Sequence, residues 1–236
     1  MSEPGSARVV LWDFDGTLAH RAGLWAGAMV EALVRSGAVP LPPEDLRPHL
    51  AAGFPWHTPD EPWGAMPATE WWGRLRLVLQ AAYARAGLDD TVAAHAAEFV
   101  ALEYYRPDAW TLVDGAAEAL ETTRAAGYRN VVLSNHPPEL AGLVAALGLD
   151  PLVDRVITSA EVGADKPHSL IFEHALRVTE AGPDVWMVGD NPVADVAGAE
   201  RAGIRAILAD GAYPDALGVT VLEAARLIAG DRPAGC

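Results

Sequence analysis

The chain has 236 residues, of which 51% are hydrophobic, and its 32 acidic against 17 basic residues give a formal net charge of −15. This size and composition allow a sizeable buried core, and the acidic field repels phosphate backbones and anionic lipids, so we expect no nucleic acid and no membrane partner. The N-terminal residues lack a signal-peptide core and no apolar stretch approaches membrane-spanning length, which predicts a cytoplasmic protein. The single cysteine, Cys236, excludes a disulfide framework and a cysteine-built metal site.

The first predicted element is a short apolar strand, residues 9–12, which leads into two acidic residues, Asp13 and Asp15, and a glycine, Gly16. Residues two apart project to the same side of a strand, and a glycine permits a sharp turn. Two nearby carboxylates repel each other unless a cation neutralises them or one of them carries a proton. The pair therefore predicts an active site, and the alternative is an ordinary strand-end turn with solvated aspartates.

Helical spacing of large apolar residues dominates the next part of the chain, which is about ninety residues long. The predicted helix faces are Trp25, Met29 and Leu33; Trp71, Leu75 and Leu79; and His95, Phe99 and Leu102. A proline-rich and aromatic connector, residues 40–69, separates the first two faces and is long enough to expect a function.

Five of the eight tryptophans fall in this helical part of the chain. They are Trp25, Trp56, Trp63, Trp71 and Trp72. Such a cluster forms either a surface for a partner or the core of a small helical domain, and we favour the core.

From about residue 112 the pattern changes to helices that alternate with short apolar runs. The predicted helices are 115–126, 140–147, 169–178 and 194–202, and the predicted strands are 131–133, 155–158, 185–188 and 205–208. Continuous apolar strands separated by helices indicate a doubly wound α/β fold with a parallel sheet that is covered on both faces. Ligands of such sheets bind beyond the carboxyl ends of the strands.

Polar residues directly follow two of these strands. Ser134, Asn135 and His136 come after the first, and Asp190 follows the third, with Asp195 five residues later. A helix cap and a turn with capping acids are the alternatives for these two places. A third strand-end acid close to the first two would complete an oxygen-rich site for a hard cation such as Mg²⁺.

Lys166 follows the strand at 155–158 and is the only lysine among the 17 basic residues. A chain that otherwise uses arginine predicts a place where a compact ammonium is needed, and the alternative is a surface lysine retained by chance. Lys166 would supply the local positive charge that the acidic whole-molecule field lacks.

Four short signals therefore stand at successive strand ends. They are Asp13-Phe14-Asp15-Gly16-Thr17, Ser134-Asn135, Lys166-Pro167, and Gly189-Asp190 with Asp195. In order and spacing they resemble the four motifs of the haloacid dehalogenase-like hydrolase superfamily, in its phosphatase-type subgroup. The resemblance implies a Rossmann-like core domain, residues 1–18 and 110–236, with a helical cap domain, residues 19–109, inserted after the first motif.

The resemblance also implies the roles of the motif residues. Asp13 attacks phosphorus and forms an aspartyl-phosphate, and Asp15 protonates the leaving alcohol and then activates water. Mg²⁺ is bound by an Asp13 oxygen, the backbone carbonyl of Asp15 and Asp190, while Asp195 orients Lys166 or a metal-bound water. Lys166 serves catalysis and phosphate binding together. The implied phosphate-binding residues are Gly16, Thr17, Ser134, Asn135 and Lys166.

Several reactions use this core, and the expected one is Mg²⁺-dependent hydrolysis of a small phosphorylated metabolite. Haloacid dehalogenases do not need an acid two residues after the nucleophile, so Asp15 favours a phosphatase. Phosphonate hydrolysis uses a cap lysine, and residues 19–109 contain none. A phosphomutase shares both aspartates and differs mainly in whether the cap excludes water. A non-catalytic binding module that uses the aromatic cap is a further alternative, against which the intact acid pair and Lys166 argue.

Substrate recognition is assigned to the cap. We expect His20, Arg21 and the connector residues 54–57 to help close it over the leaving group, which should have apolar or ring character. His57 and His136 receive no catalytic role, because a surface position explains each of them equally well. The sequence carries no signal for an oligomeric state.

Overall fold

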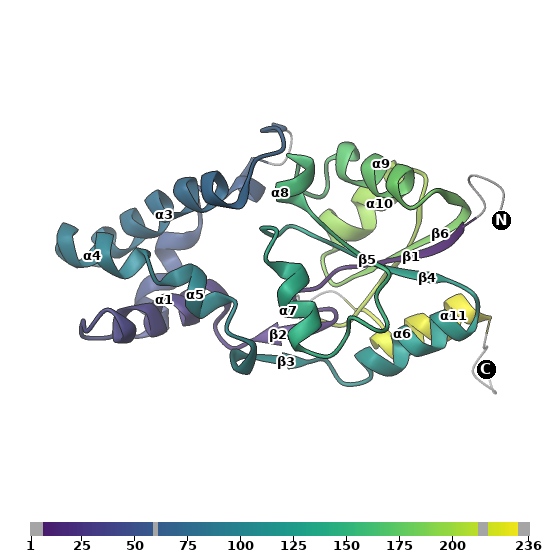
Figure 1. Cartoon of the computed structure of the whole chain (residues 1–236), viewed down its shortest axis with the longest axis horizontal. Coiled ribbons are helices and arrows are strands. Elements are labelled where there is room, and N and C mark those ends of the chain that lie inside the picture. Colours follow the sequence, from purple (N-terminus) through teal and green to yellow (C-terminus); the bar gives the residue numbers. More distant parts are fainter. Residues whose placement is uncertain (1–6, 59–60, 212–216, 231–236) are drawn as a thin grey trace.

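A central parallel sheet organises the structure, a computed structural model that describes residues 7–58, 61–211 and 217–230. Its five strands have the spatial order β5, β4, β1, β6, β7 (Figure 1). They are β1 (Ala7–Trp12), β4 (Arg129–Ser134), β5 (Arg155–Thr158), β6 (Ala181–Gly189) and β7 (Arg205–Leu208). β1 lies at the centre and pairs in parallel with β4 and β6. The predicted α/β fold is confirmed.

Helices cover both faces of this sheet, because successive residues of a buried strand point in opposite directions. In β1, Val10 and Trp12 belong to the apolar core of one face, whereas Val9 and Leu11 belong to the core of the other. The first face carries α6 (Ala116–Ala125), α7 (Leu140–Ala146) and α11 (Val221–Ala229), and the second carries α9 (Ser169–Val178) and α10 (Gly198–Arg201) (Figure 1). The short helix α8 (Ser159–Val162) follows directly on β5.

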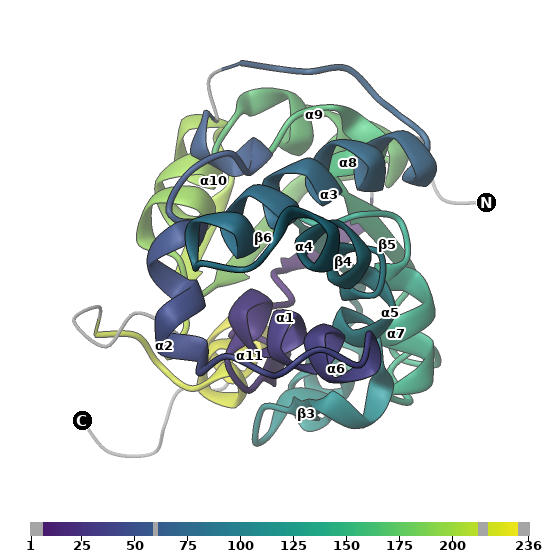
Figure 2. The same cartoon turned by 90° about the vertical axis from the view of Figure 1, so that its left-hand side faces the viewer.

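A helical insertion, called the cap below, occupies residues 22–109, between β2 (Ala19–Arg21) and β3 (Trp110–Leu112). The two strands pair antiparallel, so the chain leaves and re-enters the core at adjacent points. The cap contains α1 (Leu24–Arg35), α2 (Pro43–Leu46), α3 (Ala68–Arg85), α4 (Asp90–Ala97) and α5 (Val100–Tyr104), with short 3-10 turns at Arg47–Leu50, Pro55–His57 and Pro107–Ala109. Figure 2 looks onto these helices, with the sheet behind them.

The first two predicted helix faces of the cap are confirmed. Met29 and Leu33 of α1 and Leu75 and Leu79 of α3 are all buried, as four-residue spacing on one helix side requires. The third predicted face is wrong, since Leu102 is 56% exposed. The helix is broken between α4 and α5, and this break turns a different set of residues inward. The buried residues there are Ala93, Ala96, Ala97, Val100, Glu103 and Tyr104.

The core differs from the predicted elements in its shorter pieces. The helix predicted at residues 194–202 is a π-helical turn, Pro192–Ala197, followed by α10. β2, β3 and α8 were not predicted, because each has only three or four residues and no periodicity can develop over that length. The nine-residue helix α11 was missed as well.

The connector between α1 and α3 returns to the core. The backbone N–H groups of Trp63 and Gly64 both donate to the carbonyl of Gly163, at 2.8 and 3.1 Å. A Cβ on Gly163 would lie 2.0 Å from the carbonyl carbon of Gly64, so this approach requires glycine. The connector is thereby fixed to the loop that leads into Lys166.

Among the described residues, no helix combines the length and the apolar character that crossing a bilayer requires. Cys236 and the first six residues lie outside the described part of the chain.

Candidate active site

The carboxyl ends of the three central strands bring together residues that are distant in sequence. Asp13 follows β1, Ser134 ends β4 and Asp190 follows β6. Because β1 pairs with both neighbours, these side chains meet at one edge of the sheet, as expected for an α/β fold. The backbone N–H of Asp13 donates to the carbonyl of Val188 at 2.9 Å, which fixes the start of the first loop against β6.

Lys166 ties this edge together through a buried ion-paired cluster. Its Nζ lies 2.6 Å from Oδ1 of Asp13 and 2.6 Å from Oδ1 of Asp195, and the Ser134 hydroxyl donates to the same Asp13 oxygen at 2.9 Å. Only 3% of Lys166 is exposed. Burial alone would lower the pKa of its ammonium, but the charges of Asp13 and Asp195 outweigh burial and raise that pKa. The site therefore contains a fixed positive charge in an acidic protein.

Asn135 positions this lysine through its backbone. The Asn135 amide donates to the Lys166 carbonyl at 2.9 Å, and the Lys166 N–H donates to the Asn135 side-chain oxygen at 2.7 Å. Asp195 is held in turn by the N–H of Asn191, at 3.0 Å. Burial raises the pKa of Asp195, while Lys166 opposes that shift. The loops after β4, α8 and β6 are thus joined beneath the site.

Gly16 and Thr17 follow Asp15 in the loop that leads from β1 to β2. The N–H of Gly16 donates to the carbonyl of Ala19 at 2.8 Å, so the chain turns back at once and enters β2. Thr17 is fully buried, and its hydroxyl has no hydrogen-bond partner among the described residues. Gly16 packs closely against Asp190, since a Cβ on Gly16 would lie 2.4 Å from the Asp190 Oδ2. These two residues shape the loop.

Three buried carboxylates form a cluster that suits a metal ion. Asp13, Asp190 and Asp195 each offer one oxygen, and these oxygens lie within 4.8 Å of one another. Carboxylate oxygens in such a group are the ligands that hard divalent cations prefer. The donor set therefore fits Mg²⁺. The carboxylate of Asp15 is not part of this cluster.

The Asp15 carboxylate is held by residues that the sequence left without a role. His136 Nε2 lies 2.9 Å from Oδ1 of Asp15, and the Tyr104 hydroxyl donates to Oδ2 at 2.9 Å. The hydroxyl of Tyr105 lies 2.6 Å from Nδ1 of His136. His136 is 2% exposed, so the surface position considered for it is wrong. The sequence signal that could have placed His136 in the site is its position directly after Ser134 and Asn135.

A cavity of about 530 Å³ opens above the cluster and is walled by the cap. The core side of the lining includes the motif aspartates and Lys166, and the cap side includes Trp25 and Trp56. The full lining is Asp13, Asp15, Leu24, Trp25, Trp56, His57, Ser134, Asn135, Lys166, Pro167, Asp190, Asn191, Val193, Ala194 and Asp195. The cavity is thus charged at its floor and aromatic at its wall.

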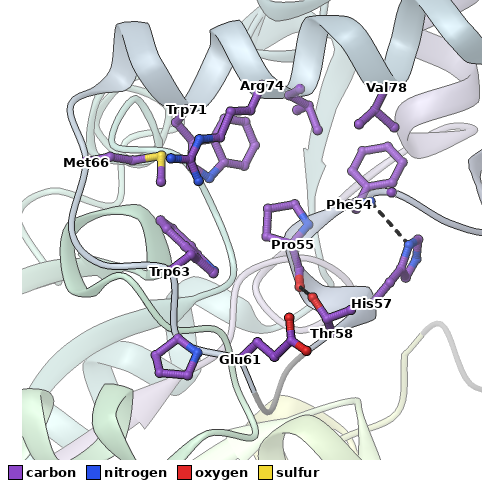
Figure 3. Close-up of a pocket in the computed structure, with 13 residues that line it drawn as sticks. Phe54, Pro55, His57, Thr58, Glu61, Trp63, Met66, Trp71, Arg74 and Val78 are labelled. Carbon is purple, nitrogen blue, oxygen red and sulfur yellow. Dashed lines mark hydrogen bonds between the residues drawn. The ribbon is translucent and has the colours of Figure 1, made fainter.

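A second cavity, of about 420 Å³, lies within the cap between the connector and α3. Figure 3 shows Trp63 and Met66 on one side of it and Phe54 and His57 on the other. The N–H of Phe54 donates to Nδ1 of His57 at 3.3 Å, drawn as a dashed line. His57 lines both cavities.

The residues of β2 and the tryptophans of the cap divide between structural positions and the cavity. Arg21 is buried and its guanidinium binds Glu31 at 2.5 Å, so it secures the base of the cap, while His20 is exposed. Among the tryptophans, Trp71 is a core residue. Trp25 stacks on Tyr104 with ring centroids 4.0 Å apart and faces the larger cavity. The expected tryptophan core therefore describes only part of the cluster.

The sequence is similar to a known protein family and to several characterised proteins. The family model of the haloacid dehalogenase-like hydrolases matches residues 7–203. The human haloacid dehalogenase-like hydrolase domain-containing protein 3 is 34% identical over 159 residues, which are 67% of this chain and 62% of that protein. The matched region thus falls short of two thirds of the human protein. A phosphoserine phosphatase of Thermus thermophilus is 42% identical over 98 residues, 40% of this chain and 39% of the enzyme.

The fold has relatives among solved structures. The putative HAD-hydrolase YfnB of Bacillus subtilis, bound to magnesium, matches with a TM-score of 0.70 over 95% of this chain and 99% of that one. At 18% identity this likeness shows the shared fold alone. The family model carries the assignment, since it spans most of the 236 residues. The chain belongs to the haloacid dehalogenase-like hydrolases.

Proposed function

We propose that the protein is a Mg²⁺-dependent phosphatase that hydrolyses a small phosphate monoester through a phosphorylated Asp13. The observation that carries the proposal is the geometry of Asp13, whose Oδ1 is held by Ser134 and Lys166 at the floor of a cavity. Asp15 lies two residues away with its carboxylate fixed by two hydrogen bonds. The partial likeness to a phosphoserine phosphatase supports the same reaction class.

The proposed reaction has two displacements at phosphorus. In the first, a carboxylate oxygen of Asp13 forms a bond to phosphorus while the bond to the ester oxygen breaks, and Asp15 gives its proton to the departing alcohol. In the second, Asp15 takes a proton from water, the water oxygen bonds to phosphorus, and the bond to Asp13 breaks. Lys166 and Ser134 stand where charge develops on the phosphoryl oxygens.

The residues that would hold the metal are Asp13 and Asp190, with the backbone carbonyl of Asp15. Their oxygen donors suit Mg²⁺, and a related fold has been solved with magnesium bound. When bound, the ion neutralises charge on the phosphoryl group and on the acidic cluster. Asp195 serves the site through Lys166, because that ammonium occupies its Oδ1 at 2.6 Å and the N–H of Asn191 occupies its Oδ2 at 3.0 Å.

The direct test is phosphate release from a panel of phosphate monoesters, with and without Mg²⁺. We expect release that stops when a chelator removes the metal and returns when Mg²⁺ is restored. Release that is indifferent to chelation contradicts the metal assignment. Transfer of the phosphoryl group to a second hydroxyl of the substrate, without free phosphate, identifies a phosphomutase instead.

The aromatic wall of the cavity favours a leaving group with apolar or ring character. Replacing Trp56 or His57 by alanine is expected to lower kcat/KM for benzyl phosphate by about tenfold, since lost apolar contact in a pocket costs roughly 1–3 kcal/mol. Hydrolysis of methyl phosphate should fall less than twofold. Val78→Ala, at a residue that lines the second cavity and not the first, is the control. Equal losses on both esters count against a role in specificity.

A further inference from the structure

The carboxylate of Asp15 sits in a hydrogen-bonded cage that is built from both the cap and the core. Tyr104, the last residue of α5, donates to Oδ2 from the cap side. His136, just after β4, contacts Oδ1 from the core side. Each distance is 2.9 Å, and both side chains are buried. Each carboxyl oxygen can take part in more than one hydrogen bond, so the cage leaves a position for substrate or water.

The protonation of the cage follows from its tyrosines. Burial raises the pKa of Tyr104 and of Tyr105 well above the ordinary range, and the charge of Asp15 raises both further. Both phenols therefore keep their protons. When Tyr105 donates to Nδ1 of His136, that nitrogen carries no hydrogen, and Nε2 is the ring atom that donates to Asp15. In this arrangement every polar hydrogen of the cage points along a chain that ends at the Asp15 carboxylate.

The cage is rigid because its members are packed from several sides. The Tyr104 ring stacks on Trp25, and the Tyr104 carbonyl accepts the indole N–H of Trp110 at 2.7 Å. Phe14 lies edge-on to the His136 ring at 6.0 Å, and Tyr105 lies edge-on to Trp72. Movement of α5 away from the core would break the contacts of Tyr104 and Tyr105 with Asp15 and His136 together.

We propose that Tyr104 and His136 are positioning residues for Asp15, and that through them the placement of the cap decides whether the acid/base is aligned. The proposal rests on the proposed phosphatase function and extends it to residues outside the four motifs. Tyr105 contacts His136 and not Asp15, and it acts by fixing the orientation of the His136 ring. Neither Tyr104 nor His136 needs to touch the substrate for this role.

The test compares two esters with similar rings and different needs for acid catalysis. p-Nitrophenyl phosphate has a good leaving group, whereas benzyl phosphate releases a strongly basic alkoxide unless it is protonated. The ratio of kcat/KM for the two esters reports protonation of the leaving oxygen, because this parameter extends only to the first irreversible step. General acid catalysis contributes about 10²–10⁴-fold, so partial misalignment should cost about tenfold on benzyl phosphate.

The expected result is a benzyl to p-nitrophenyl ratio that falls about tenfold in Tyr104→Phe and in His136→Leu. Tyr104→Phe keeps the stacked ring and removes only the hydroxyl. His136→Gln retains an amide donor and should restore most of the ratio, and Tyr105→Phe should have a smaller effect than Tyr104→Phe. Equal losses on both esters, or no rescue by glutamine, would overturn the positioning role.

An independent readout separates this proposal from the phosphatase assignment. Nitrogen NMR of the imidazoles, with the His136 signals identified by their absence in His136→Gln, should show Nε2 protonated and Nδ1 as an acceptor. Loss of this pattern in Asp15→Ala supports the cage, and the opposite tautomer overturns it. If the unmodified protein releases no phosphate from any ester of the panel, the phosphatase proposal fails and the kinetic test of the positioning role fails with it, while the tautomer still decides whether the cage exists.

Discussion

Replacing Asp13 by asparagine will lower phosphate release by on the order of a thousandfold or more, because an amide is a poor nucleophile and cannot form the acyl-phosphate. The substitution retains a side-chain oxygen that can accept from Ser134 and Lys166, which already contact Oδ1 in the native protein. Loss of activity should therefore occur in a folded protein. The measurement is kcat on the best ester of the panel, with circular dichroism as the check on folding.

Asp114→Asn is the matched control, because Asp114 is an exposed residue outside the cavity and the change in charge is the same. Its activity should equal that of the unmodified protein. An Asp13→Asn variant that keeps more than about a tenth of the native rate contradicts a nucleophilic role for Asp13.

Replacing Lys166 by methionine will reduce both stability and activity. The ammonium is the shared partner of Asp13 and Asp195, and its removal leaves two buried carboxylates without their cation. Breaking a buried ion pair in this way costs about 3–5 kcal/mol of unfolding free energy. Removing a positive group that stabilises transferred charge should lower kcat by about 10²–10³-fold.

Denaturant unfolding without Mg²⁺ measures the stability loss, and repetition with Mg²⁺ should recover part of it, since the ion would neutralise the same carboxylates. Lys166→Arg keeps the charge but replaces the compact ammonium with a planar fork, so it should be more stable than the methionine variant and still slow. A methionine variant as stable as the native protein in the absence of metal would show that the buried pairs contribute no net stability.

The sheet and the motif residues were predictable because their signals are local. A four-residue apolar run identifies a buried strand, and the residue after it must lie at the strand's carboxyl end. The sequence thus indicated Asp13, Ser134 and Asp190 as neighbours, although 121 residues separate the first two. Lys166 was identified by composition, as the only lysine of the chain.

The cage around Asp15 was not predictable in the same way. Tyr104 lies 89 residues from Asp15 in the sequence, and their contact depends on how the cap is placed over the core. Aromatic residues in a helical segment usually indicate packing in a core, and nothing in their spacing indicates a hydrogen bond to a catalytic group. The break between α4 and α5 was missed as well, because the apolar spacing predicted one continuous helix face through His95, Phe99 and Leu102.

The central claim is that Asp13 carries the phosphoryl group, and trapping that intermediate tests it most directly. The protein would be mixed with Mg²⁺ and its best ester, quenched in acid within the first turnover and reduced with borohydride, which converts an aspartyl-phosphate to homoserine. Peptide mass spectrometry should then find homoserine in place of Asp13 in the native protein. Phosphate release without homoserine at position 13 at any quench time, or homoserine at another aspartate, would contradict the account.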